Sequence, residues 1–163
     1  MPMLYPRHFG GGGTTWPIAG MKKPNAIVLN TETQKWLFPT GYYCVVRRFS
    51  AKEEKRRIVA SVVEPNVFDN LPLLGFENHL NVFHENRRGL SEPLARGLAM
   101  FLNSTAVDDL FRCVSGHTQV NATDLRLMRF PTREVICRIG DWAASHPRPT
   151  QEQIDACLGE LIA

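Results

Sequence analysis

Two runs of strand-forming residues, 42–49 and 57–63, flank a polar segment at 50–56. Both runs are rich in aromatic and β-branched side chains, which favour extended backbone, and a connection of this length can join neighbouring antiparallel strands. The pattern predicts a β-hairpin whose tip is the polar segment. Two further runs, 26–29 and 75–84, predict additional strands. We therefore expect a curved, mainly antiparallel sheet in the N-terminal half of the chain.

The apolar residues take up helical spacing after residue 90. Leu94, Leu98 and Phe101 repeat at intervals of four and three, and Ser91 stands where an N-cap would begin the helix. Thr150 and Gln153 form the pattern of a capping box before the last helix. The expected helices cover 92–102, 107–114, 132–145 and the segment after Thr150. Strands followed by helices predict an α+β fold, in which the C-terminal helices pack against the sheet.

Length and composition are those of one globular unit. The 163 residues are 44% hydrophobic, which is enough for a single core. We expect a loop-like or linker-like segment at 1–24, where Gly10 to Gly13 and several prolines occur, a main domain at 25–131 and a helical support at 132–163.

The sequence also indicates where the chain is located and whether its cysteines are reduced. It has no run of about 18 apolar residues and no basic-then-apolar leader, so we expect no membrane partner and a cytoplasmic location. The four cysteines are far apart and form no paired motif. This spacing predicts reduced thiols rather than a disulfide framework or a zinc site.

Positive charge is concentrated in the predicted hairpin. The net charge is only +3, but residues 47–57 hold six bases and two acids, a surplus of four. A local basic ridge on a near-neutral protein suits a polyanion such as DNA, although a solvated hairpin tip has the same composition. The candidate phosphate-contacting residues are Arg47, Arg48, Lys52, Lys55, Arg56 and Arg57, and the next predicted turn adds Arg87 and Arg88.

A second unusual stretch runs from 114 to 131. Residues 115–124 are almost wholly polar, and each amide or hydroxyl buried without a partner costs on the order of 1–3 kcal/mol, so we expect a surface loop. Residues 125–131 mix apolar and basic side chains and end at Pro131, which predicts a short docked segment. A polar loop held by an anchored segment is suited to recognition.

Several ordered motifs resemble one protein family. They are W-L-F-P-T-G-Y-Y at 36–43, R-R-F-S-A-K-E-E-K-R-R at 47–57, G-F-E-N-H-L-N-V-F-H at 75–84, F-L-N-S-T-A-V-D-D-L-F-R at 101–112 and the stretch at 114–131. Together they resemble the C-terminal target-recognition (specificity) domain of adenine-specific DNA methyltransferases of bacterial restriction-modification systems. The resemblance covers most of the chain. It implies that the chain binds double-stranded DNA beside a methyltransferase catalytic domain, on the same or a separate polypeptide.

The resemblance suggests two kinds of DNA contact. In such domains basic side chains hold phosphates, and other polar side chains read base edges in the groove. The candidates for base readout here are His117, Thr118, Gln119 and Asn121, because amides can pair bidentately with adenine and hydroxyls with several bases. The alternative is that this loop hydrogen-bonds to its own backbone and serves the scaffold.

The sequence contains no recognisable catalytic motif. The Asn-Pro-Pro-Tyr type of motif that holds the target adenine in that family is absent, and so is a strand followed by a glycine-rich turn that could seat S-adenosylmethionine. We expect no catalysis, cofactor or metal in this chain alone, with S-adenosylmethionine bound by the catalytic domain.

Two other functions compete with DNA recognition. One is a stand-alone protein-interaction or regulatory module associated with such a methyltransferase. The other is a metal-dependent nuclease that uses His79, His84 and Glu85. Two histidines five residues apart on one strand would face opposite sides of the sheet, which argues against the nuclease.

Overall fold

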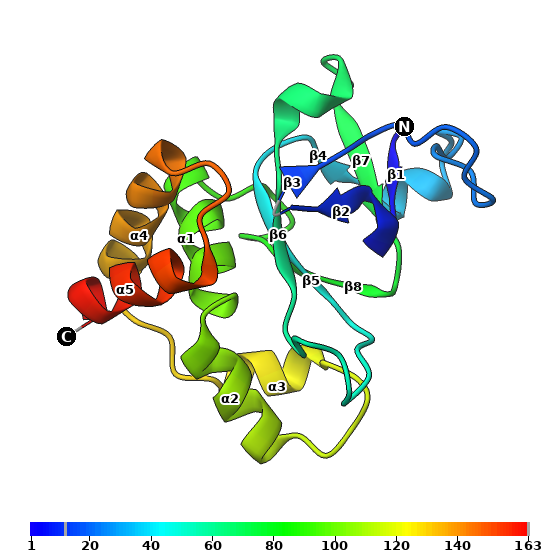
Figure 1. Ribbon diagram of the computed structural model, residues 1–163. Helices are drawn as coiled ribbons and strands as arrows, with labels where there is room; N and C mark the ends of the chain where they lie inside the picture. The colour runs from blue at the N-terminus through cyan, green and yellow to red at the C-terminus, as the bar shows by residue number, and fades with distance from the viewer. Residues whose placement is uncertain (12, 163) are drawn as a thin grey trace.

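The computed structural model describes residues 1–11 and 13–162, and it has the expected α+β architecture (Figure 1). The strands are β1 (Met3–Leu4), β2 (Phe9–Gly10), β3 (Gly13–Thr14), β4 (Phe38–Pro39), β5 (Tyr43–Arg47), β6 (Ala60–Val63), β7 (Leu73–Phe76) and β8 (Leu80–Phe83). The α-helices are α1 (Glu92–Leu102), α2 (Thr105–Val114), α3 (Ala122–Leu127), α4 (Arg133–Ser145) and α5 (Gln151–Ile162). Figure 1 shows α1, α4 and α5 on one side of β5 and β6, and the N-terminal strands on the other.

The central sheet has the strand order β6-β5-β8, and both pairs are antiparallel. β5 and β6 confirm the predicted hairpin, with a register that runs from Tyr43 opposite Val63 to Val46 opposite Ala60. A second sheet has the order β1-β7-β4, in which β1 runs parallel to β7, and β2 pairs with β3. The sheets are therefore mainly antiparallel, as expected.

The prediction of one strand over 75–84 is wrong. This stretch contains the end of β7 and all of β8, and these strands belong to different sheets. The Glu77 carboxylate accepts a hydrogen bond of 3.0 Å from the His79 backbone N–H, and the Glu77 carbonyl accepts another of 3.0 Å from the Leu80 N–H. These bonds close a turn that sends the chain from one sheet to the other.

The strand predicted at 26–29 is also wrong. Only Ala26 forms a β-bridge, to Pro2, and the side chains of Val28 and Leu29 are 77% and 45% exposed. The Asn30 side chain accepts hydrogen bonds of 2.9 Å from the backbone N–H groups of Glu32 and Thr33, which turns the chain away before a ladder can extend.

The segment at 1–24, predicted to be loop-like, is irregular over most of its length but takes part in the sheets. Leu4 is fully buried in β1, and Met3 pairs with Gly75. The buried His8 contacts the Asn25 side chain at 3.0 Å, which fixes the end of the segment. Within the glycine run, Gly12 lies outside the described residues, as does Ala163 at the end of the predicted helical support.

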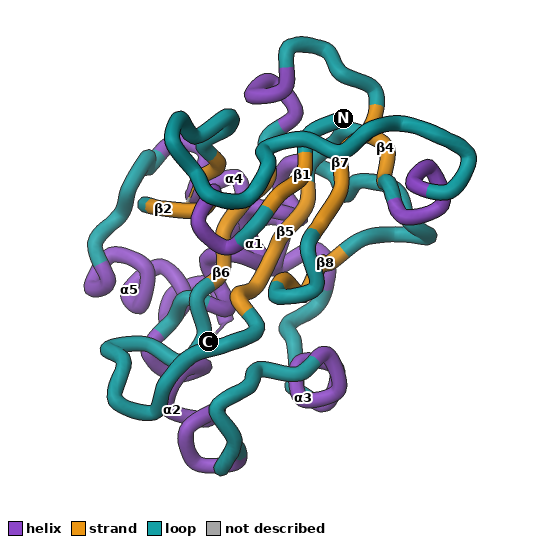
Figure 2. The backbone as a smooth tube through the Cα atoms, turned by 90° about the vertical axis from the view of Figure 1, so that its right-hand side faces the viewer, coloured by secondary structure: helices purple, strands orange, loops and turns teal. Residues whose placement is uncertain are grey.

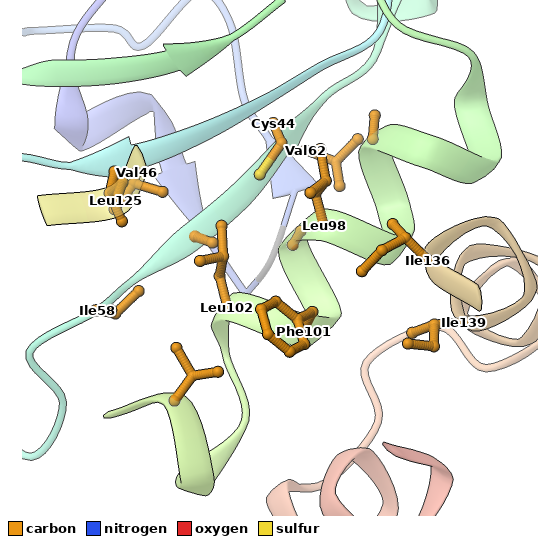
Figure 3. Packing of buried hydrophobic residues seen from close by; sticks show 14 of the residues in the cluster. Cys44, Val46, Ile58, Val62, Leu98, Phe101, Leu102, Leu125, Ile136 and Ile139 are labelled. Carbon is orange, nitrogen blue, oxygen red and sulfur yellow. The ribbon is translucent and has the colours of Figure 1, made fainter. Parts of the chain in front are cut away.

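Two apolar clusters lie on the two faces of β5. Tyr43 and Val45 point into a cluster formed with the second sheet, whereas Cys44 and Val46 point into the larger cluster under the helices. This alternation follows from the two-residue period of a strand. Figure 3 shows part of the larger cluster, with Cys44 and Val46 from β5 and Leu98 from α1. β5 is therefore buried on both faces, and it fixes the position of the segments that continue from its two ends.

α4 is packed against α1 through glycine. A Cβ atom built on Gly97 would lie 1.8 Å from the Ile136 carbonyl oxygen, and one built on Gly140 would lie 1.8 Å from the Pro93 carbonyl oxygen. The two helix backbones are thus in direct contact. Ile136 and Ile139 belong to the same cluster as Cys44 and Leu98 (Figure 3), so one core joins 25–131 to 132–163.

The other predicted helices agree closely with the structure, and one short helix was not expected. Ser104 caps α2 by accepting a hydrogen bond from the Val107 N–H, and Thr150 and Gln153 form the predicted capping box of α5. α3 occupies a stretch that was predicted to be loop and docked segment. It begins after Asn121, whose backbone N–H donates to the Asp124 carboxylate at 3.2 Å. No helix in the described part of the chain is both long and apolar enough to cross a membrane.

Candidate nucleic-acid interface

The hairpin tip and the polar loop after α2 form one continuous surface. The Ser50 N–H donates to the Thr118 carbonyl at 3.1 Å, and the Val120 N–H donates to the Arg48 carbonyl at 2.7 Å. These bonds extend β5 by a short antiparallel bridge between Phe49 and Gln119. We call residues 47–57 and 115–121 together the tip–loop surface. Figure 2 shows the chain beyond the ends of β5 and β6 reaching toward α2.

Side chains of α2 hold the hairpin tip in place through hydrogen bonds. The Asp108 carboxylate accepts hydrogen bonds of 2.8 Å from the backbone N–H groups of both Arg57 and Ile58. Arg112 pairs with Asp108 at 2.9 Å and donates to the Lys52 carbonyl at 3.0 Å. The tip is therefore fixed by charge-assisted hydrogen bonds that start from one helix.

The ionisation of Asp108 follows from these contacts. Burial by itself raises the pKa of its carboxyl group, but the hydrogen bonds from the Ile58 N–H, Arg112 and the Arg57 N–H together lower it below the ordinary value. Asp108 is thus held as an anion at neutral pH, which is the form that accepts these bonds.

Three of the six predicted basic residues are turned outward. Lys52 and Lys55 are exposed, and no ion pair in the described part of the chain involves either one. Arg48 is half-buried, with its guanidinium 5.9 Å from the centre of the Phe49 ring. These three side chains can approach a phosphate without giving up an internal ion pair.

The other three bases of the ridge are held by the protein. Arg47 forms an ion pair with Glu54, and Arg56 donates to the Gln151 side chain and the Ser104 carbonyl, each at 2.9 Å. Arg57 is only 2% exposed. The hydrogen bond from the Ala51 N–H and the contact with Arg47 lower the pKa of Glu54, so the Arg47 ion pair is charged at neutral pH. Only three of the six bases that were predicted to contact phosphates therefore face outward.

Arg57 is the centre of the internal network. Its Nε donates to the Ser50 hydroxyl at 3.0 Å, and its Nη2 donates to the His117 carbonyl. The side chain thus links the tip to the loop across 60 residues of sequence. This position does not support the prediction that Arg57 lies on the outer surface against DNA.

Arg87 and Arg88 lie in a separate turn, where Asn86 and Arg87 have positive φ angles. The Arg87 guanidinium lies 4.5 Å from the centre of the Phe38 ring and donates to the Lys35 carbonyl at 3.0 Å. Arg88 is exposed. The side chain of Arg87 thus contacts residues 35–38 rather than the tip–loop surface.

The four base-readout candidates separate into two groups. His117 and Thr118 are exposed and Gln119 is half-buried, and in the described part of the chain their side chains form no hydrogen bond. Asn121 instead occupies the N-cap of α3. The loop backbone is bonded to the backbone of the hairpin tip, while the side chains of His117 and Thr118 are exposed and that of Gln119 is partly exposed.

An aromatic pair on this surface was missed by the sequence analysis. Phe49 is 42% exposed, and His79 meets its ring edge-on with 4.9 Å between ring centres. An exposed aromatic residue next to Arg48 can contact a base or sugar as well as stabilise the cation. The available signal was Phe49 itself, the last residue of a predicted strand and the neighbour of two arginines.

The proposed nuclease residues are dispersed among separate contacts. His79 approaches Glu77 at 3.0 Å, the His84 ring accepts from the Arg87 N–H at 3.2 Å, and Glu85 pairs with Arg133. Among residues 1–11 and 13–162 no group of three metal-ligating side chains is close enough to hold an ion. The geometry gives no support to a metal site.

The fold and this surface define an α+β module that presents basic, aromatic and polar side chains from a hydrogen-bonded scaffold. The chain is 51% identical over 163 residues to the Type II methyltransferase M.BsuBI of Bacillus subtilis, an alignment that covers 99% of this chain and 32% of that protein. It is 50% identical over 134 residues to the Type II methyltransferase M.PstI of Providencia stuartii, covering 82% of this chain and 26% of that protein. No protein-family model matches the chain, and no solved structure gives a significant match.

These comparisons confirm the resemblance to methyltransferases of restriction-modification systems. The chain spans about a third or less of the length of the curated relatives it matches. It is therefore homologous to one region of such enzymes.

Proposed function

We propose that the chain is the DNA target-recognition region of an adenine-specific methyltransferase of a restriction-modification system. The observation that carries this proposal is the tip–loop surface, which exposes bases and unbonded polar side chains on a scaffold homologous to part of Type II methyltransferases. Adenine specificity rests on the motif resemblance. Methyl transfer and the binding of S-adenosylmethionine belong to the catalytic region, which the chain accompanies on the same or a separate polypeptide.

The exposed side chains suit the two kinds of contact that sequence recognition requires. Arg48, Lys52 and Lys55 would hold phosphates, and His117 with Thr118 would reach base edges. Because the loop backbone is already bonded to β5, little ordering would accompany binding. Neutralising about three phosphates gives a salt slope near −2.7 at about 0.9 per contact, so the isolated chain binds DNA tightly only at low salt.

Selection from randomised duplex DNA tests this function. The purified chain is mixed with the pool at low salt, and the recovered duplexes are sequenced. Enrichment of a short motif is the expected result, together with its loss in the Lys52→Glu/Lys55→Glu variant. Failure to recover any duplex at low salt would contradict the proposal.

An apolar groove of about 490 Å³ between α2 and α3 supports a second role, contact with the catalytic region. Leu110, Val114 and Leu127 line it and are 51%, 73% and 78% exposed. Relatives are at least three times as long as the matched segment, and the remaining region is the partner that would cover such a surface.

Mixing the chain with the unmatched part of the Bacillus subtilis relative tests this contact. We expect association that is weakened by Leu127→Glu and unaffected by Val28→Glu, which places the same charge at an equally exposed position elsewhere. If the two substitutions weakened the association equally, the groove would not be part of the interface.

A further inference from the structure

A small pocket lies where the hairpin tip, the end of α2 and the start of the polar loop meet. Its volume is about 270 Å³. It is lined by Lys52, Arg57, Arg112, Cys113, Ser115 and Gly116. Three of these residues are cations and none is an acid, and of the three only Arg112 is paired with a carboxylate, that of Asp108, so the lining carries a surplus of positive charge.

The charge of Arg57 in this pocket is not balanced by an ion pair. Arg57 is 2% exposed, and no carboxylate among the described residues forms a salt bridge with its guanidinium. The two acids around it are paired with other bases: Asp108 with Arg112, and Glu54, whose carboxyl pKa the charge of Arg57 helps to lower, with Arg47. The Phe111 ring, 5.4 Å from the guanidinium carbon, compensates only in part. Burying an unpaired charge is unfavourable, and an anion in the pocket would remove that penalty.

Ser115 supplies a second, independent observation. The residue is only 9% exposed, and its hydroxyl oxygen has no hydrogen-bond partner. A buried hydroxyl without a hydrogen-bond partner is destabilising unless a ligand supplies the missing hydrogen bond. Next to it, a Cβ atom on Gly116 would meet nothing within 4 Å, so the approach to the backbone is open.

We propose that this pocket binds one phosphate of the DNA backbone. A phosphodiester is compact and anionic and offers several acceptor oxygens, which matches Lys52 Nζ, the unused Nη1 of Arg57 and the Ser115 hydroxyl. The pocket opens at the start of the loop that carries His117 and Thr118, so a strand held there passes the candidate base readers. This assignment rests on the proposed function and gives Arg57 a phosphate-binding role from an interior position.

Inorganic phosphate is the first probe. Its dissociation constant is measured by thermal stabilisation of the full chain at constant ionic strength, with chloride and acetate as comparison anions. We expect Lys52→Met and Ser115→Ala to weaken phosphate binding by about fivefold or more. Lys22→Met is the matched control, because it removes the same charge at an exposed residue that belongs neither to the pocket nor to the tip–loop surface.

The variants are expected to fold. Lys52 is exposed, and Ser115→Ala removes a hydroxyl that has no partner in the protein. The free energy of unfolding of Ser115→Ala without phosphate should equal or exceed that of the parent chain. Phosphate binding that is unchanged in both pocket variants would overturn the proposal. Stabilisation by acetate equal to that by phosphate would also overturn it, since the occupant would then be a protein carboxylate.

A short duplex of arbitrary sequence is the second probe. Ser115→Ala should lower duplex affinity without changing the salt slope, whereas Lys52→Met should lower the slope by about 0.9. If neither substitution affected duplex binding, the assignment of the pocket to a DNA phosphate would be overturned and the proposed function would still stand. Failure of the parent chain to bind any duplex would overturn the DNA assignment of the pocket together with the proposed function, even if inorganic phosphate bound.

Discussion

The contact between α1 and α4 and the tip–loop surface are both held by close contacts, but the contacts are of opposite kinds. The helices touch at glycine, with Gly97 against the Ile136 carbonyl and Gly140 against the Pro93 carbonyl, inside an apolar core. The tip and loop are instead joined by polar bonds to Asp108, Arg112 and backbone groups, and their outer side chains remain exposed. The comparison shows a scaffold that excludes water and a surface that is fixed yet still able to bind a polar ligand.

The largest effect should come from adding a methyl group to the helix contact. In Gly140→Ala the new Cβ would lie 1.8 Å from the Pro93 carbonyl oxygen, so α4 must move away from α1. We expect a loss of about 3 kcal/mol or more in the free energy of unfolding, measured with urea. Gly159→Ala in α5 is the control, because its Cβ would meet nothing within 4 Å, and it should stabilise the chain by about 0.5–1 kcal/mol. Equal stability of the two variants would show that the helices are not in close contact.

The next largest effect should come from the polar support of the tip. Asp108→Ala leaves the N–H groups of Arg57 and Ile58 without their acceptor and Arg112 without its carboxylate. We expect a loss of about 2–3 kcal/mol in the free energy of unfolding. If the tip were held mainly by apolar packing, this substitution would cost much less, and the contrast between the two regions would disappear.

Acid should weaken the polar region through the same carboxylate. The pKa of Asp108 is lowered in the folded chain, so its stabilising contribution is present above the unfolded value of 3.8 and is lost as the pH falls through the folded pKa. The free energy of unfolding should therefore fall more steeply below about pH 4 in the parent chain than in Asp108→Asn. Parallel pH profiles of the two proteins would contradict the assignment.

The smallest effect should come from the cap of α3. Asp124→Ala removes the acceptor of the Asn121 N–H, and we expect a loss of about 0.5–1 kcal/mol in the free energy of unfolding. Amide hydrogen exchange would show faster exchange confined to α3. Exchange that increased throughout the polar loop would mean that α3 is the main anchor of that loop.

The sequence predicted the scaffold better than the surface because scaffold patterns are local. The hairpin and the long helices follow from periodicity and caps within a few residues, as at Thr150 and Gln153. The break between β7 and β8 depends on a turn closed by two hydrogen bonds to Glu77, one to its side chain and one to its carbonyl, within an otherwise strand-like run. The burial of Arg57 depends on Ser50 and on His117, 60 residues away, so the composition of the tip could not reveal which bases face outward.

The central claim is that the tip–loop surface, not the helix contact, meets DNA. It is tested most directly by titrating a short duplex into the isotope-labelled chain and following the backbone amide signals by NMR. We expect shifts concentrated at residues 47–57 and 115–121, with the signals of α4 unchanged. Shifts confined to α4 and α5, or no shifts at low salt, would contradict it.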